Sequence, residues 1–220
     1  MVSVAIDGPA GAGKSTIAKM LSRKLGFIYV DTGALYRSIG YYSILNGIDY
    51  KDNVKVSNLL NTINIDLKIK DDRQYVYINN IDVTDRIRTP EVSMAASSVS
   101  AIPRVREFLL NLQKQIAVKN NVIMDGRDIG TVVLPDAKVK IFLTASSEER
   151  AKRRYDDLIK ENKNIVFEDV LKDIKQRDYN DSTRKIAPLK PADDAKIVDT
   201  TGETLEQSVS RLYSIIKEQL

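Results

Sequence analysis

Short apolar runs and longer amphipathic stretches alternate in the N-terminal part of the chain. Apolar runs at 2–6 and 27–30 predict two buried strands, because each is short and bounded by polar or small residues. The stretch 14–25 carries apolar residues at helical spacing and is followed by Gly26, a typical helix end. Residues 34–45 predict a second helix. An order of strand, helix, strand, helix indicates an α/β fold built on a parallel sheet.

The same patterns continue to the C-terminus. Further strands are predicted at 122–124, 139–143 and 197–198. Further helices are predicted at 90–99, at 103–118, from the cap Ser146 to about 160, from 167 to about 178, and at 205–220.

Residues 63–87 break this alternation of strands and helices. Ile63, Ile65, Leu67 and Ile69 alternate with polar residues, and a second alternating run follows. The pattern predicts a small antiparallel β insert of two or three strands, either part of a binding site or a surface hairpin without a role. No internal repeat divides the chain, so we expect one α/β domain over 1–220 that carries this insert.

The composition narrows the possible chemistry. The chain has no Cys and no His, which excludes disulfides, thiolate nucleophiles, the Ser-His-Asp triad and metal sites made of Cys or His. Carboxylates, Lys, Arg, hydroxyls and backbone N–H groups remain, and they suit phosphoryl transfer. The net charge of +4 permits an anionic ligand but does not indicate a protein that coats DNA. No apolar run reaches the length of a membrane span and no basic leader precedes the first strand, so a cytoplasmic protein is expected.

One motif indicates a specific ligand. The segment Gly8-Pro9-Ala10-Gly11-Ala12-Gly13-Lys14-Ser15 matches the P-loop pattern, and it lies between a predicted strand and a predicted helix. Its glycines let backbone N–H groups approach phosphates, and the helix N-terminus adds partial positive charge. Lys14 is expected to contact the β- and γ-phosphates of ATP as a catalytic residue, and the Ser15 hydroxyl to hold Mg²⁺. Residues 8–16, which include Thr16, are therefore the candidate ATP site.

Polar residues after two other predicted strands suggest a second anion site. Thr32 and Arg37 follow the strand at 27–30, where ligand-binding loops of parallel sheets lie. Asp125 follows the strand at 122–124 and is placed like a Walker-B acid or an acceptor-site carboxylate. Arg127 and Asp128 come next and could instead pair with each other.

A charged helix carries three further arginines. Arg150, Arg153 and Arg154 are spaced so that they share one helix face. They could form a lid that closes on transferring phosphates, or a solvated face neutralised by nearby acids.

Two other helices carry candidate side chains. Arg104 and Arg106 face different ways at the head of one helix, so only one is expected to serve a ligand. Arg177 and Arg184 share a face if their helix persists, with Asp181 between them. These three residues form either an ion-pair ladder or a set of groups for a ribose phosphate.

The segments together resemble the bacterial cytidylate kinases, a family of nucleoside monophosphate kinases, over almost the whole chain. The resemblance rests on 6–16, 31–37, 97–107, 125–133, 140–146, 176–178 and 187–189. It implies a P-loop three-layer fold with a central parallel five-stranded sheet. It also implies a monophosphate-binding lobe over about 32–104 that includes the β insert, and an Arg-bearing helical lid over about 147–166.

The resemblance implies a reaction and residue roles as well. The reaction is transfer of the ATP γ-phosphoryl to CMP or dCMP with Mg²⁺. Thr32 matches a hydroxyl position on the monophosphate side, where some relatives have Ser. Arg37, Arg106 and Arg184 match groups that hold the acceptor phosphate. Ser97, Arg106 and Asp125 match groups that read the cytosine edge. Arg177 and Asp181 match a pair near the sugar, and Arg127 is a further substrate-binding candidate. Arg150, Arg153 and Arg154 match the charges that stabilise the transition state.

Other functions remain as alternatives. The expected partners are ATP, CMP and dCMP, with a monomeric protein and neither nucleic acid nor membrane as a partner. A kinase for UMP, AMP or a non-nucleotide acceptor would use the same P-loop, and so would a nucleotide-binding module without turnover. RNA binding is disfavoured, because aromatic residues make up only 6% of the chain and Trp is absent.

Overall fold

The computed structural model describes residues 1–70, 73–160 and 165–220. Its centre is a five-stranded sheet in the order β2-β6-β1-β7-β8, and all neighbouring strands are parallel. The strands are β1 (Ser3–Asp7), β2 (Ile28–Asp31), β6 (Val122–Gly126), β7 (Val139–Thr144) and β8 (Lys196–Asp199). The predicted parallel five-stranded sheet is confirmed.

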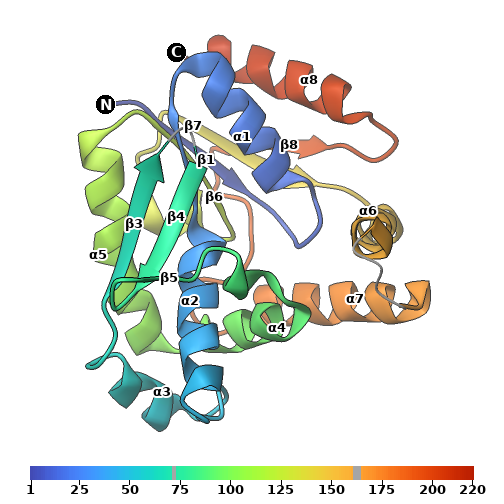
Figure 1. Ribbon diagram of the computed structural model, residues 1–220. Helices are drawn as coiled ribbons and strands as arrows, with labels where there is room; N and C mark the ends of the chain where they lie inside the picture. The colour runs from blue at the N-terminus through green and yellow to red at the C-terminus, as the bar shows by residue number, and fades with distance from the viewer. Residues whose placement is uncertain (71–72, 161–164) are drawn as a thin grey trace.

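Helices cover both faces of this sheet and make three layers (Figure 1). Successive β1 residues face opposite ways: Ile6 packs with Leu21 and Leu212, whereas Ala5 packs with the helix side that carries Ala117. The first face is covered by α1 (Lys14–Leu25) and α8 (Leu205–Lys217), and the second by α5 (Pro103–Lys119). Strands buried on both faces explain the short, continuous apolar runs.

The β insert is a three-stranded antiparallel sheet in the order β3-β4-β5. Its strands are β3 (Ile65–Lys70), β4 (Arg73–Ile78) and β5 (Ile81–Asp82). The predicted insert is thus confirmed, although its residues 71–72 lie outside the described part of the chain. The insert packs through Val76 and Ile78 into a cluster that includes Leu35 and Ile39 of the helix after β2.

Four further elements surround the insert. They are α2 (Thr32–Leu45), α3 (Asn53–Leu59), the 3-10 turn η1 (Arg86–Arg88) and α4 (Pro90–Val99). The sequence did not predict α3, a short helix that begins where the Asp52 carboxylate accepts hydrogen bonds from two backbone N–H groups.

Two helices lie on the side of the molecule away from the insert, and the first of them covers most of the predicted lid at 147–166 (Figure 1). They are α6 (Ser147–Lys160) and α7 (Phe167–Thr183), which pack through Leu158 and Val170. Residues 161–164 of the predicted lid lie outside the described part of the chain. The helix α7 runs beyond its predicted end at 178, but it still ends before Arg184, whose backbone is extended. Within the described ranges, no helix has the length and apolar composition needed to cross a membrane.

Candidate functional site

A cleft of about 900 Å³ opens at the carboxyl ends of β2 and β6, beside the loop that follows β1. Its walls come from the P-loop, the start of α2, α4, the residues after β6, and the helices α6 and α7. Ligands of open parallel sheets bind at this edge. The cleft brings together these predicted site residues: Ala10 to Thr16, Thr32, Arg37, Ser97, Asp125, Arg127, Arg153, Arg154, Arg177, Asp181 and Arg184.

The P-loop wraps the N-terminus of α1 in a conformation that needs glycine. Gly8 has a φ of 149°, and a Cβ there would lie 1.9 Å from the carbonyl oxygen of Leu143. Gly13 has a φ of 84° and caps the N-terminus of α1 without a side chain in the way. The loop therefore presents backbone N–H groups toward the cleft, the arrangement that binds phosphate oxygens.

Lys14 is buried at the start of α1, and its ammonium donates to the carbonyl of Pro9 at 2.6 Å. Burial, followed by the charge of Arg127, lowers the pKa of Lys14 well below its usual value. An anion in the cleft would oppose the effect of Arg127, because it supplies a counter-charge to both cations. Lys14 is therefore positioned to stabilise the negative charge of a bound phosphate chain.

Ser15, Tyr29 and Asp125 form a buried oxygen cluster next to the P-loop. The Ser15 hydroxyl donates to Asp125 Oδ2 at 2.7 Å, and the Tyr29 hydroxyl donates to Asp125 Oδ1 at 3.0 Å. Burial and the nearby Asp31 carboxylate raise the pKa of Asp125. One hydroxyl and one carboxylate, completed by phosphate oxygens, is a donor set that fits Mg²⁺. No group of three or more acidic side chains in the described ranges could hold a metal by itself.

The start of α2 places Arg37 over a buried carboxylate that the sequence analysis did not select. Asp31 caps the helix by accepting from the Ala34 N–H at 3.0 Å, and it accepts from Arg37 at 2.7 Å. Arg88 lies 3.8 Å from the same carboxylate. The Thr32 hydroxyl, also predicted for this site, donates to the backbone carbonyl of Asp125 at 2.7 Å.

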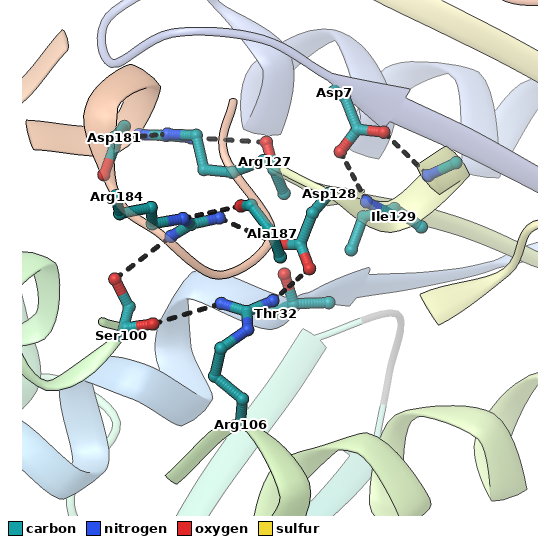
Figure 2. A network of polar contacts seen from close by, with 12 residues as sticks. Asp7, Thr32, Ser100, Arg106, Arg127, Asp128, Ile129, Asp181, Arg184 and Ala187 are labelled. Atoms are coloured by element: carbon teal, nitrogen blue, oxygen red, sulfur yellow. Dashed lines mark hydrogen bonds and ion pairs between the residues drawn. The ribbon is translucent and has the colours of Figure 1, made fainter. Parts of the chain in front are cut away.

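Arg106 does not pair with Asp125, the residue with which the resemblance groups it at the cytosine edge. It pairs with Asp128 instead (Figure 2). Asp128 also accepts from Arg184 at 3.3 Å, and both guanidiniums contact Ser100. Asp125 points to Ser15, on the P-loop side. The carboxylate beside Arg106 is therefore Asp128, which the sequence analysis weighed only as a partner of Arg127.

Ser97 lies on the α4 wall of the same cleft. Its hydroxyl is buried and has no hydrogen-bond partner among the described atoms. Buried hydroxyls without partners are rare, so Ser97 is available to a ligand.

Arg127 turns away from Asp128 and binds Asp181 on α7, with Nε donating to Oδ2 at 2.8 Å. The sequence offered two other ion pairs, Arg127 with Asp128 and Arg177 with Asp181. The structure pairs Arg127 with Asp181 instead. Arg184 leaves the predicted shared face with Arg177, because α7 ends before it.

Burial, and then the charge of Arg127, lowers the pKa of Arg177 to about 10. Arg154 and Arg37 act in the same direction, so four guanidiniums converge on one region of the cleft.

The structure separates the three arginines of α6. Arg153 and Arg154 line the cleft, and Arg153 binds Glu149 at 2.7 Å. Arg150 is buried outside the cleft lining and donates to the carbonyls of Ala145 at 2.8 Å and Ala10 at 2.9 Å. It also pairs with Asp178 of α7 at 2.7 Å. The spacing predicts that the three arginines share one face, turned either to transferring phosphates or to solvent. Arg150 does neither, because it is buried and its guanidinium donates to protein groups.

A further carboxylate was missed because it lies just before the motif. Asp7 ends β1, is buried, and accepts from the N–H groups of Ile129 and Gly130, both at 2.7 Å (Figure 2). It thereby fixes the π-helical turn η2 (Ile129–Val133), which directly follows Arg127 and Asp128. A charged residue directly after an apolar strand run was the available signal.

A phosphate-binding loop that faces a second cleft wall rich in arginine defines a P-loop phosphotransferase with an anionic acceptor. Comparison with known proteins gives the family. The family model described as Cytidylate kinase matches residues 4–218. The chain belongs to the cytidylate kinase family.

Relatives and solved structures agree with this placement. The chain is 48% identical to a cytidylate kinase of Caldicellulosiruptor bescii, over 100% of this chain and 99% of the relative. It is 49% identical to a cytidylate kinase of Lactobacillus johnsonii, over 100% of this chain and 95% of the relative. A shikimate kinase structure from Bacteroides thetaiotaomicron covers 98% of each chain with a TM-score of 0.50 and 14% identity, which supports the fold alone.

Proposed function

We propose that the protein transfers the γ-phosphoryl group of ATP to CMP or dCMP, and that Asp128 rather than Asp125 reads the base. One observation carries the residue assignment. Asp128 is held between Arg106 and Arg184, on the acceptor side of the cleft that also contains Ser97. Cytosine presents an amine donor beside two acceptors, and a carboxylate flanked by guanidiniums and a hydroxyl complements that edge. Uracil would place a carbonyl oxygen where cytosine has the amine.

The donor half is assigned to the P-loop. Backbone N–H groups from Ala10 to Thr16 and the ammonium of Lys14 bind the phosphates of ATP. Ser15 and Asp125 are the residues that would hold Mg²⁺, which when bound neutralises phosphate charge. Arg153 and Arg154 supply further positive charge from the lid.

The acceptor phosphate is assigned to the converging guanidiniums. Arg37, Arg127 and Arg177 line the cleft, and their mutual repulsion falls when an anion binds. Asp181, which accepts from Arg127, is assigned to the sugar, and Arg184, which donates to Asp128, is assigned to the base edge. Thr32, held on the Asp125 carbonyl, supports the same wall.

These residues act by binding and orientation. The acceptor phosphate oxygen is itself the nucleophile, so the transfer needs no strongly basic side chain. The arginines and Lys14 hold two phosphate chains in line and stabilise the charge of the transferring group. Closure of the lid over the cleft excludes water, which would otherwise take the phosphoryl group.

A direct assay tests the function. ADP release from MgATP is measured with CMP, dCMP, UMP, AMP and no acceptor in parallel. ADP formation with CMP and dCMP alone supports the proposal. Activity with UMP or AMP instead contradicts the acceptor assignment, and ATP binding without any turnover favours a binding module. The monomeric state and the cytoplasmic location stay predictions from the sequence.

A further inference from the structure

Gln74 of β4 joins the β insert to the central sheet. Its side-chain amide brackets the backbone of Asp31, the last residue of β2. Gln74 Oε1 accepts from the Asp31 N–H at 2.9 Å, and Nε2 donates to the Asp31 carbonyl at 3.3 Å. One side chain thus satisfies both polar groups of one backbone residue.

The position of β2 explains why a side chain can do this. β2 is the end strand of the five-stranded sheet and pairs with β6 on one side, where Asp31 is in register with Asp125. An end strand leaves backbone donors and acceptors without a strand partner. A primary amide carries one donor and one acceptor side by side, so Gln74 takes the place of a neighbouring strand at that residue.

The side chain of Asp31 carries this restraint into the cleft. The carboxylate is buried, caps α2 through the Ala34 N–H, and binds Arg37 at 2.7 Å. Burial would raise the pKa of Asp31, but Arg37 and Arg88 outweigh it and lower the pKa. The ionised carboxylate therefore holds Arg37 in a fixed direction. Rotation of the Asp31 backbone would redirect the carboxylate and the guanidinium together.

We propose that Gln74 is a positioning residue for the acceptor phosphate: through its amide, the β insert holds Asp31 so that Asp31 aims Arg37 into the cleft. The inference rests on the proposed assignment of Arg37 to that phosphate. It gives the insert a function besides its packing against α2, because docking of the insert sets how well the acceptor binds.

The test uses the full-length protein with Gln74→Ala, Gln74→Glu and the control Lys68→Ala. Lys68 is exposed on the neighbouring strand, and its charge contacts lie within the insert, at Asp66 and Tyr77. Steady-state turnover gives KM for CMP and for ATP, and calorimetry gives CMP binding without turnover. We expect Gln74→Ala to raise KM and Kd for CMP about three- to tenfold, the effect of one or two hydrogen bonds, with KM for ATP unchanged.

Gln74→Glu separates hydrogen bonding from space filling. Glu has nearly the same shape, but it cannot donate to the Asp31 carbonyl and it brings a second negative charge near Asp31. We expect it to raise KM for CMP at least as much as Gln74→Ala does. Rescue by Glu, or an equal rise in KM for CMP and ATP, would overturn the positioning role.

Combination with Arg37→Met tests the route. If Gln74 acts through Arg37, then Gln74→Ala adds little to the KM for CMP in the Arg37→Met background. If the two substitutions instead multiply their effects on KM for CMP in the double variant, Gln74 does not act through Arg37. An active wild type with an unchanged Gln74→Ala variant refutes the coupling alone. A wild type that neither binds nor phosphorylates CMP refutes the proposed function and the coupling with it.

Discussion

In the donor half of the cleft, one continuous loop faces the phosphates. In the acceptor half, the proposed binding groups come from α2, α4, α5, the residues after β6, and α7 with the residue that follows it. The loop relies on backbone N–H groups whose direction follows from glycine conformations such as that of Gly8. The acceptor half relies on side chains that orient one another, as Asp128 orients Arg106 and Arg184. A substitution in the donor half should therefore affect that residue's own contacts. A substitution in the acceptor half should also change the orientation of neighbouring side chains.

The largest expected effect concerns the donor half. Lys14→Ala should lower kcat by about a thousandfold, because a charge next to the transferring group stabilises the transition state more than the ground state. KM for CMP should change less, since the ammonium of Lys14 is hydrogen-bonded within the P-loop, to the carbonyl of Pro9. Turnover and circular dichroism on the same sample measure this. A folded variant with near-normal kcat would contradict the P-loop assignment.

The acceptor half is tested by a matched pair of carboxylates. Asp128→Asn should raise KM for CMP about 30- to 100-fold, because it removes a charged acceptor and leaves two buried guanidiniums without a counter-charge. Asp125→Asn should instead weaken the dependence of the rate on Mg²⁺, with less change in KM for CMP. Titrations of CMP and of Mg²⁺ compare the two variants. A larger CMP effect for Asp125→Asn would restore the original interpretation of Asp125.

Asp7 precedes the P-loop and binds the turn η2 on the acceptor side. Its burial makes the free energy of unfolding depend on pH. Burial, opposed by its bonds to Gly130 and Ile129, raises the pKa of Asp7 from 3.8 to about 6. The folded state then binds a proton more tightly than the unfolded state, so this stabilisation is complete below about pH 4 and is lost as the pH rises through about 6. The unfolding free energy of the wild type minus that of Asp7→Asn should fall by about 2 kcal/mol between pH 4.5 and 7. Urea unfolding at several pH values measures it, and a flat difference would contradict the shift.

Arg150 is expected to give the smallest of these effects. Arg150→Met removes the bonds to Ala10 and Ala145, so the P-loop loses a support and KM for ATP should rise about fivefold, which corresponds to about 1 kcal/mol. The exposed neighbour Lys152→Ala serves as the control. Arg154→Ala should lower kcat without lowering the melting temperature, in contrast to Arg150→Met. If Arg150→Met lowers kcat and leaves KM for ATP unchanged, Arg150 acts on the transferring phosphate and does not merely support the P-loop.

The two halves also differ in how far the sequence predicts them. The P-loop is contiguous and depends on backbone conformation, so a local pattern is enough to place it. The alternation at 63–87 predicts the insert for the same reason. The acceptor contacts join residues far apart: Arg106 is 22 positions from Asp128, and Arg184 is 56 positions from it. A sequence shows that these charges exist, but only the packed fold decides which acid pairs with which base.

Helix geometry limited the prediction at α6. The spacing of Arg150, Arg153 and Arg154 places them on one side of the helix, but a helix that crosses a surface exposes its turns to different surroundings. The first turn of α6 lies against the P-loop, where Arg150 is enclosed, and the next turn reaches the cleft. The α3 helix was missed because it is short and its start depends on the Asp52 cap.

The bonds of Arg150 have a consequence for how the molecule opens under native conditions. The bonds of this one guanidinium connect α6, α7, the end of β7 and the P-loop. Separation of α6 and α7 from the core would therefore release the carbonyl of Ala10 in the same event. Amide hydrogens of the P-loop and of the first turn of α6 should exchange with solvent as one cooperative unit, with a common opening free energy. The outer strands of the insert, β3 and β5, pair with β4, the strand that carries Gln74. They should exchange independently and sooner.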